Sequence, residues 1–155
     1  RQPGIEELMK QIKDRGFLVK LDTNGTYPKK LASVMKNGLA DYIAMDIKSS
    51  PSGYPAACGI PGFDIAPVKE SIDLIKNSGT EYEFRTTVVK GIHTEDDIIA
   101  AAQMIKGADK YFLQAYVDSG ELINDSGLSA FTAEEMNDML TAVKPFVKYS
   151  ALRGI

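Results

Sequence analysis

The stretch Ala40-Asp41-Tyr42-Ile43-Ala44-Met45-Asp46-Ile47-Lys48 decides the fold of this chain. Its short apolar run predicts a buried β-strand over Tyr42–Lys48, followed by a long loop over 49–64 that is rich in Ser, Pro and Gly. Alternate residues of a strand point to one face, so Asp46 and Lys48 are expected to project the same way. Parallel α/β folds build ligand sites at such strand ends. Alternatively, Asp46 and Lys48 form a structural ion pair at the end of the sheet and bind no ligand.

Strands and helices alternate along the rest of the chain. Further strands are predicted at 17–21, 82–89, 110–116 and 146–149, and helices at about 4–15, 28–37, 65–78, 94–106 and 132–144. The first helix is expected to bury Ile5, Leu8, Met9 and Ile12 on one face. Thr94-x-x-Asp97 and Thr132-x-x-Glu135 are typical of helix-starting capping boxes.

This alternation predicts an α/β fold with a parallel sheet of about five strands and five helices, in a single domain over 1–155. An open doubly wound sheet and a partial barrel that lacks its first strands both fit the pattern. A helical pattern begins within five residues of Arg1, so we expect the chain to be part of a longer protein.

Composition excludes several classes of function. A net charge of −3 with a pI near 5.2 argues against a nucleic-acid partner, and no apolar run is long enough to span a membrane. The sequence does not open with a signal peptide. One cysteine, Cys58, fits a reducing cytoplasm and cannot by itself hold zinc or an iron–sulfur cluster.

Polar residues gather at the predicted strand ends. They are Asp22, Thr23, Asn24, Asp46, Lys48, Arg85, Thr87, Lys90, Gln114 and Tyr116. This set suits a polar, zwitterionic or phosphorylated ligand. Asp22-Thr23-Asn24-Gly25 is equally typical of a plain turn. Arg85 is unusual in mid-strand, and Glu83 is its expected partner. His93 is interpreted as a solvated residue at a helix start, and Cys58 as incidental.

Four segments together resemble one family. They are Leu21-Asp22-Thr23-Asn24-Gly25, Asp41–Lys48, Glu81–His93 and Tyr111-Phe112-Leu113-Gln114. In order and spacing, from Arg1 to about Gln114, they resemble the radical SAM enzymes that activate glycyl-radical proteins. Activators of anaerobic ribonucleoside-triphosphate reductase are the nearest likeness, with those of pyruvate formate-lyase close to them.

The resemblance implies a partial (β/α) barrel without its first two βα units. The family holds a [4Fe–4S] cluster on a Cys-x-x-x-Cys-x-x-Cys loop and carries a Gly-Gly-Glu-Pro segment, and this sequence contains neither. The resemblance further implies that the enzyme cleaves S-adenosylmethionine reductively and abstracts a glycine hydrogen from a partner enzyme. A flavodoxin or ferredoxin is the implied electron donor. Without cluster ligands, this chain alone is expected to be catalytically silent.

The resemblance also assigns residues toward S-adenosylmethionine. They are Thr23, Asn24, Asp46, Lys48 and Arg85, with Gln114 and Tyr116 where pyruvate formate-lyase activators carry a histidine. Two alternatives stay open. One is a self-contained α/β domain that binds a phosphorylated or zwitterionic small molecule at its strand ends. The other is an interaction module that docks a partner through 49–64 and 118–130. A barrel that lacks its first two strands would also expose Phe17–Leu21 as an apolar edge strand. We expect a dimer to cover this edge.

Overall fold

The computed structural model describes residues 3–117 and 127–155, so most of the polar loop predicted over 118–130 lies outside the described residues. Its strands form one five-stranded sheet in the order β1-β2-β3-β4-β5, and the pairs β1–β2, β3–β4 and β4–β5 are parallel. The predicted α/β fold with five parallel strands is therefore confirmed. The chain divides into two compact units, Arg1–Asp46 with Ala66–Tyr82, and Ile47–Ile65 with Glu83–Ile155.

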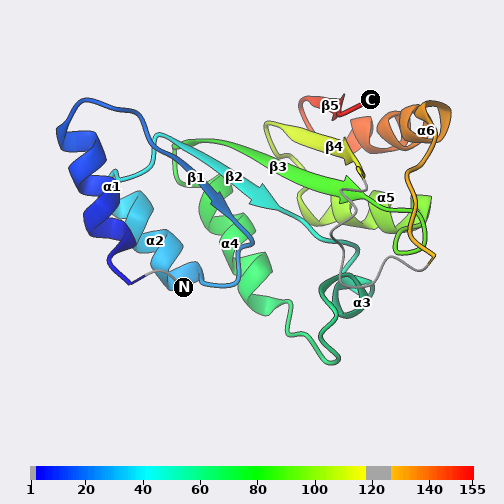
Figure 1. Cartoon of the computed structure of the whole chain (residues 1–155), viewed down its shortest axis with the longest axis horizontal. Helices are drawn as coiled ribbons and strands as arrows, with labels where there is room; N and C mark the ends of the chain where they lie inside the picture. The colour runs from blue at the N-terminus through cyan, green and yellow to red at the C-terminus, as the bar shows by residue number, and fades with distance from the viewer. Residues whose placement is uncertain (1–2, 118–126) are drawn as a thin grey trace. The chain divides into compact units, whose positions relative to one another are not determined.

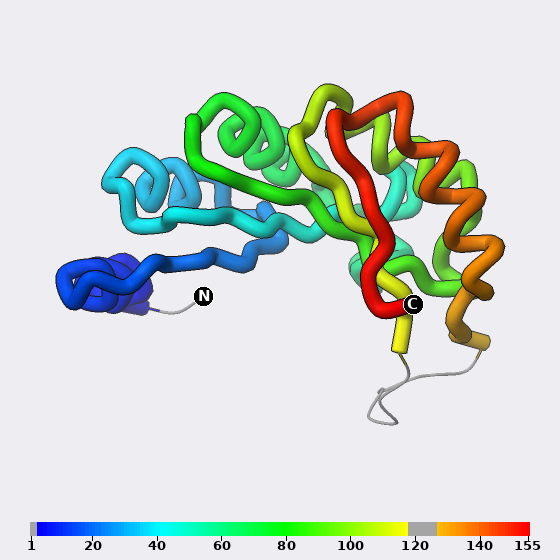
Figure 2. The backbone as a smooth tube through the Cα atoms, turned by 90° about the horizontal axis from the view of Figure 1, so that it is seen from above, coloured from blue at the N-terminus to red at the C-terminus, as the bar shows by residue number. Residues whose placement is uncertain are grey.

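The first unit holds two complete strands and three helices, which Figure 1 labels. They are α1 (Ile5–Asp14), β1 (Lys20–Thr23), α2 (Pro28–Lys36), β2 (Tyr42–Asp46) and α4 (Ala66–Lys76). β1 and β2 run alongside each other as the blue and cyan tubes of Figure 2, with Thr23 in register with Met45. Buried Leu31, Val34, Ile43 and Ile72 form the core between these strands and α2 and α4.

The second unit contains the larger part of β3 (Glu81–Val88), followed by α5 (Glu95–Met104), β4 (Tyr111–Ala115), α6 (Ala133–Val143), a 3₁₀ helix (Lys144–Phe146) and β5 (Ser150–Arg153). The short helix α3 (Tyr54–Cys58) precedes them. Both predicted capping boxes are present, at Thr94–Asp97 and Thr132–Glu135. Phe84, Ile98, Tyr111, Leu113 and Met136 are fully buried in the core of this unit.

Three predicted elements were placed wrongly. β1 begins at Lys20 rather than Phe17, because Phe17 still donates to Ile12 at the end of α1 and the ladder with β2 starts at Lys20. The last strand lies at Ser150–Arg153 rather than 146–149, because Pro145 ends α6 in a 3₁₀ turn. The loop predicted over 49–64 contains α3, which gives six α-helices among the described residues instead of five.

The predicted inward face of α1 is only partly buried. Met9 is 3% exposed, whereas Leu8 is 50% exposed, so the expectation for Leu8 was wrong. Phe17 and Leu18, just before β1, are 65% and 84% exposed. β1 is an end strand of the sheet, and these apolar side chains therefore lie beside an open edge. No helix in the described part of the chain is long and apolar enough to cross a membrane.

Candidate functional site

The seven predicted site residues fall into both units: Thr23, Asn24 and Asp46 into the first, and Lys48, Arg85, Gln114 and Tyr116 into the second. In the first unit, Thr23 ends β1 and its register partner Met45 precedes Asp46, the last residue of β2. These three residues therefore lie at the adjacent carboxyl ends of two parallel strands, as the sequence predicts.

Hydrogen bonds within the turn after β1 engage the side-chain oxygens of Thr23 and Asn24 as acceptors. The Thr23 hydroxyl accepts from the Gly25 N–H at 3.1 Å, and Asn24 Oδ1 accepts from the N–H and hydroxyl of Thr26 at 3.1 and 2.8 Å. The turn interpretation of this segment is thus correct. The Thr23 hydroxyl proton and the Asn24 amide N–H groups are what these side chains can offer a ligand.

Gly25 is required in this turn for two physical reasons. Its φ of +73° is a conformation that side-chain-bearing residues rarely adopt, and an added Cβ would clash with the Met45 side chain. Its carbonyl accepts from the Ser71 hydroxyl of α4 at 2.7 Å. The glycine therefore lets the end of β1 pack directly on β2 and α4.

In the second unit, one face of the strands is polar and the other is buried. Arg85 is in register with Phe112, and Thr87 with Gln114, which in turn is in register with Arg153. Residues paired in register on neighbouring strands point to the same face of the sheet, as do residues two apart on one strand. Arg85, Thr87 and Gln114 therefore lie on the same face. Arg85 and Gln114 are half-buried, whereas Phe84, Thr86 and Leu113 on the other face are buried.

Glu83 has a partner that the sequence does not reveal. Both terminal nitrogens of Arg153 donate to its carboxylate, at 2.9 and 2.8 Å, whereas the sequence suggests only Arg85 as its partner. The Arg153 guanidinium also lies 3.4 Å from the centroid of the Phe112 ring. This bidentate pair fixes β5 to β3 across β4 and places two arginines on the polar face.

Lys48 does not belong to the strand that the sequence assigns it to. β2 ends at Asp46, so the predicted strand end at Lys48 was two residues too late and strand alternation does not extend to Lys48. The Ile47 N–H donates to the Arg85 carbonyl at 2.7 Å, and the next residue leaves the ladder with its side chain exposed. Lys48 is therefore placed by the segment after β2 rather than by strand pairing.

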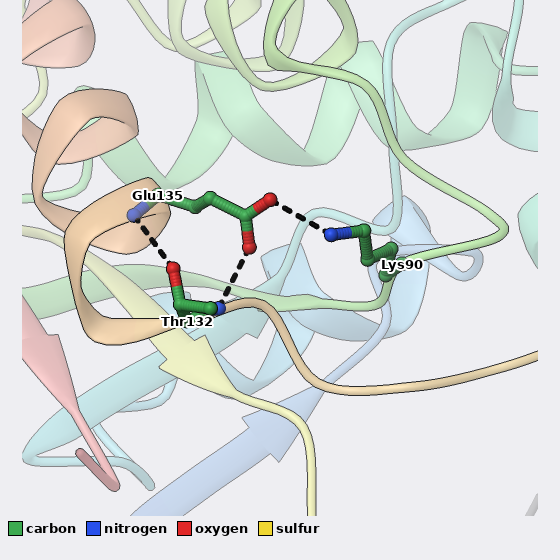
Figure 3. Close-up of polar contacts among 3 residues, drawn as sticks. All are labelled: Lys90, Thr132 and Glu135. Atoms are coloured by element: carbon green, nitrogen blue, oxygen red, sulfur yellow. Dashed lines mark hydrogen bonds and ion pairs between the residues drawn. The ribbon is translucent and has the colours of Figure 1, made fainter.

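Tyr116 follows β4 directly and is half-buried. Lys90, another residue at a strand end, ties the segment after β3 to α6 (Figure 3). Its ammonium donates to Glu135 at 2.8 Å, and its backbone exchanges two hydrogen bonds with Ser129 at 2.9 and 3.1 Å. The Lys90 bond lowers the pKa of Glu135. Lys90 therefore serves the structure here.

Sequence reasoning missed His93. Its ring is 7% exposed rather than solvated, Nδ1 accepts from the Val89 N–H at 3.0 Å, and Nε2 lies 2.7 Å from the Lys48 carbonyl. Forty-five residues separate His93 from Lys48, and no local pattern predicts a contact at that separation. Cys58 is half-buried in α3, and burial raises the pKa of its thiol, which agrees with an unreactive role.

The donor set fits one proposed cofactor and not the other. The carboxylate, hydroxyl and amide groups of the first unit, and the ammonium, guanidinium and amide groups of the second, are each of a kind that can bind part of a zwitterion such as S-adenosylmethionine. Across residues 3–117 and 127–155, no group of three or more His, Cys, Asp or Glu side chains is arranged to hold a metal ion. With a single cysteine in the sequence, the residues of this chain do not fit an iron–sulfur cluster.

Comparison with known proteins points to one group of enzymes. The chain is 34% identical over 119 residues to a protein of Methanocaldococcus jannaschii that is provisionally named a glycyl-radical enzyme activating enzyme. The match covers 75% of this chain and 50% of that protein, so the chain spans about half the length of the curated relative it matches. No family model matches the sequence.

The fold is also shared with a solved structure. A domain of pyruvate-formate lyase-activating enzyme from Bacteroides vulgatus superposes with a TM-score of 0.76 over 97% of this chain and 89% of that domain, at 16% identity. At this identity the likeness concerns the fold alone. The sequence similarity to the Methanocaldococcus protein is therefore the comparison that connects this chain to an activating enzyme.

Proposed function

We propose that this chain is part of a radical S-adenosylmethionine activase, an oxidoreductase that generates a glycyl radical on a partner enzyme. The similarity to the Methanocaldococcus protein carries the proposal, and the shared fold and the polar strand ends support it. The partner is a glycyl-radical enzyme of the anaerobic ribonucleotide reductase or pyruvate formate-lyase type. A flavodoxin or ferredoxin supplies electrons, in the cytoplasm.

The chain's own residues contribute the binding of S-adenosylmethionine. Asp46 suits the ammonium or the ribose hydroxyls of the cofactor, and Lys48 its carboxylate, since each offers the opposite charge or an acceptor. Thr23, Asn24, Arg85, Gln114 and Tyr116 complete the proposed contact set. When bound beside a [4Fe–4S] cluster, this cofactor supplies the radical chemistry.

Cluster ligation lies outside this chain in the proposal, because one cysteine cannot supply three thiolates. The isolated chain should therefore neither cleave S-adenosylmethionine nor bind it with micromolar affinity. Isothermal calorimetry on the isolated chain and an assay for 5′-deoxyadenosine test both statements. Micromolar binding, or cleavage without added domains, would contradict them.

The decisive experiment uses the full-length protein that contains this chain, anaerobically loaded with its cluster. Electron paramagnetic resonance should detect a glycyl radical on a co-incubated glycyl-radical enzyme, at a level that falls at least tenfold for Asp46→Asn and for Lys48→Met. Lys36→Met, at the exposed end of α2, is the matched control and should leave the signal unchanged. Absence of the radical with an intact cluster would refute the proposal.

The alternative function, a self-contained domain for a phosphorylated or zwitterionic small molecule, makes the opposite prediction. Such a domain should bind its ligand tightly as the isolated chain, and its full-length sequence should lack a Cys-x-x-x-Cys-x-x-Cys segment ahead of Arg1. Sequencing the upstream reading frame separates the two functions.

A further inference from the structure

The segment that follows β2 is held by side chains from several parts of the second unit. Thr86 of β3 donates to the Ile47 carbonyl at 2.7 Å, and the Tyr54 hydroxyl accepts from the Lys48 N–H at 3.2 Å. Ser50 donates to Asp97 of α5 at 2.6 Å. These three hydrogen bonds involve Ile47, Lys48 and Ser50, which follow the last residue of β2.

His93 makes the bond at the centre of this segment. The Val89 N–H can only donate a hydrogen bond. Nδ1 of the His93 ring, 3.0 Å away, must therefore be the unprotonated nitrogen that accepts it. The ring proton of the neutral imidazole then resides on Nε2, which donates to the Lys48 carbonyl at 2.7 Å. The two bonds fix both the tautomer and the orientation of the ring.

The backbone of Lys48 is consequently held on both sides. Tyr54 binds its N–H, and His93 binds its carbonyl. The Tyr54 ring is 1% exposed and stacks on Phe63 with centroids 5.3 Å apart, so it is itself immobilised. The exposed Lys48 side chain therefore starts from a backbone whose N–H and carbonyl are both hydrogen-bonded.

We propose that His93 is a positioning residue for Lys48: its Nε2–H fixes the peptide from which the Lys48 ammonium reaches the S-adenosylmethionine carboxylate. This inference rests on the proposed function, which assigns Lys48 to that cofactor. A bond from the ring to a backbone carbonyl restricts where the ammonium can lie and so reduces the entropy lost when the ligand binds.

The position of Asp97 supports this role for the segment. Its carboxylate accepts from Ser50 and, as the capping-box residue, from the N–H and hydroxyl of Thr94 at 3.0 and 2.8 Å. The helix start that places His93 is thus also bonded to the segment that carries Lys48. Two independent bonds, from His93 and from Asp97, connect the start of α5 to that segment.

The first test needs no cofactor. Nitrogen-15 NMR of the chain should show the His93 ring as the neutral Nε2–H tautomer, and the Lys48 amide as ordered as those of β3. His93→Leu should lower the heteronuclear NOE of Lys48, whereas His93→Gln, whose amide can accept from Val89 and donate to Lys48, should restore it. The opposite tautomer, or an unchanged Lys48 amide in His93→Leu, would overturn the inference.

The second test is a double-mutant cycle on the full-length protein, with S-adenosylmethionine binding measured by calorimetry. His93→Leu should weaken binding about tenfold, as loss of one hydrogen bond that positions a contact would. In a Lys48→Met background it should have almost no further effect. His93→Gln should recover most of the affinity in the protein that retains Lys48.

The outcomes separate the two proposals. If Lys48→Met weakens binding but His93→Leu weakens it equally in both backgrounds, His93 is merely structural and only this inference fails. If Lys48→Met leaves the affinity unchanged, the assignment of Lys48 under the proposed function fails as well. A full-length protein that does not bind S-adenosylmethionine at all refutes both.

Discussion

The carboxylate of Glu83 accepts two hydrogen bonds from the guanidinium of Arg153, at 2.9 and 2.8 Å, although 70 residues separate them in the sequence. The Glu83 side chain is only 3% exposed and that of Arg153 is 36% exposed. The pair therefore joins a buried carboxylate on β3 to a cation on the last strand, and its geometry is the bidentate one that arginine favours.

Removing Arg153 should leave a buried carboxylate without the guanidinium that donates two hydrogen bonds to it. We expect Arg153→Met, which keeps the stem over Phe112, to lower the free energy of unfolding by about 2 to 3 kcal/mol. Urea denaturation followed by circular dichroism measures this change. Lys148→Met, which breaks an exposed pair with Asp109 at 2.7 Å, is the control and should cost less than about 1 kcal/mol. Equal losses would show that burial of Glu83 has no energetic consequence.

Substitution of Gly25 should be far more costly than substitution of an unpacked glycine in the same conformation. Gly25→Ala combines a strained positive φ with a clash against Met45, and we expect a loss of about 2 to 4 kcal/mol in unfolding free energy. Gly38→Ala has a φ of +61° and no neighbour within 4 Å, so it should cost only about 1 kcal/mol. Thermal unfolding of both variants compares them, and similar melting temperatures would contradict close packing at Gly25.

Low pH should weaken the hydrogen bonds by which Asp41, just before β2, binds Lys13 of α1 and the Val19 N–H. The hydrogen bond from Lys13, followed by that from the Val19 N–H, lowers the pKa of Asp41. A carboxyl whose pKa is lowered on folding stabilises the native state above its unfolded pKa of about 3.9, and this contribution is lost as pH falls through the folded value. Urea midpoints at pH 7 and pH 2.5 should therefore differ more in the parent chain than in Asp41→Asn. Identical differences would contradict this.

The open edge beside β1 should promote self-association. Phe17 and Leu18 are 65% and 84% exposed, and exposed apolar residues beside the open edge of a sheet favour contact with a second copy. We expect light scattering to show a dimer at high concentration, and Leu18→Asp to return the chain to a monomer. Ile60→Asp, at a 52% exposed position in the other unit, should leave the dimer intact. A strict monomer at every concentration would refute the prediction.

Local signals in the sequence predicted local structure well. Thr94 and Thr132 start helices as their capping boxes require, and Val68, Ile72 and Ile75 of α4 are buried as their spacing predicts. A side chain that bonds within its own helix turn needs no information from elsewhere in the chain. The order of strands and helices follows from such signals, which is why the fold class could be predicted.

Contacts between distant segments could not be predicted. His93 was interpreted as solvated because its neighbours are those of a helix start, whereas its partner Lys48 lies on another segment. Arg153, which donates two hydrogen bonds to Glu83, lies in a strand that the sequence placed four residues too early. The candidate residues at strand ends were identified by a general rule of parallel sheets, but the bonds that hold them depend on tertiary structure.

The second unit is assembled from two stretches of chain, because residues 66–82 between them fold into the first unit. On the ribosome, Lys48 is therefore made long before His93, which follows 45 residues later. At ordinary rates of synthesis this is an interval of roughly 2 to 9 seconds. For most of that time the segment after β2 lacks the bonds that Thr86 of β3, His93 and Asp97 of α5 later make to it, so the full set forms only after the residues of the first unit have been made.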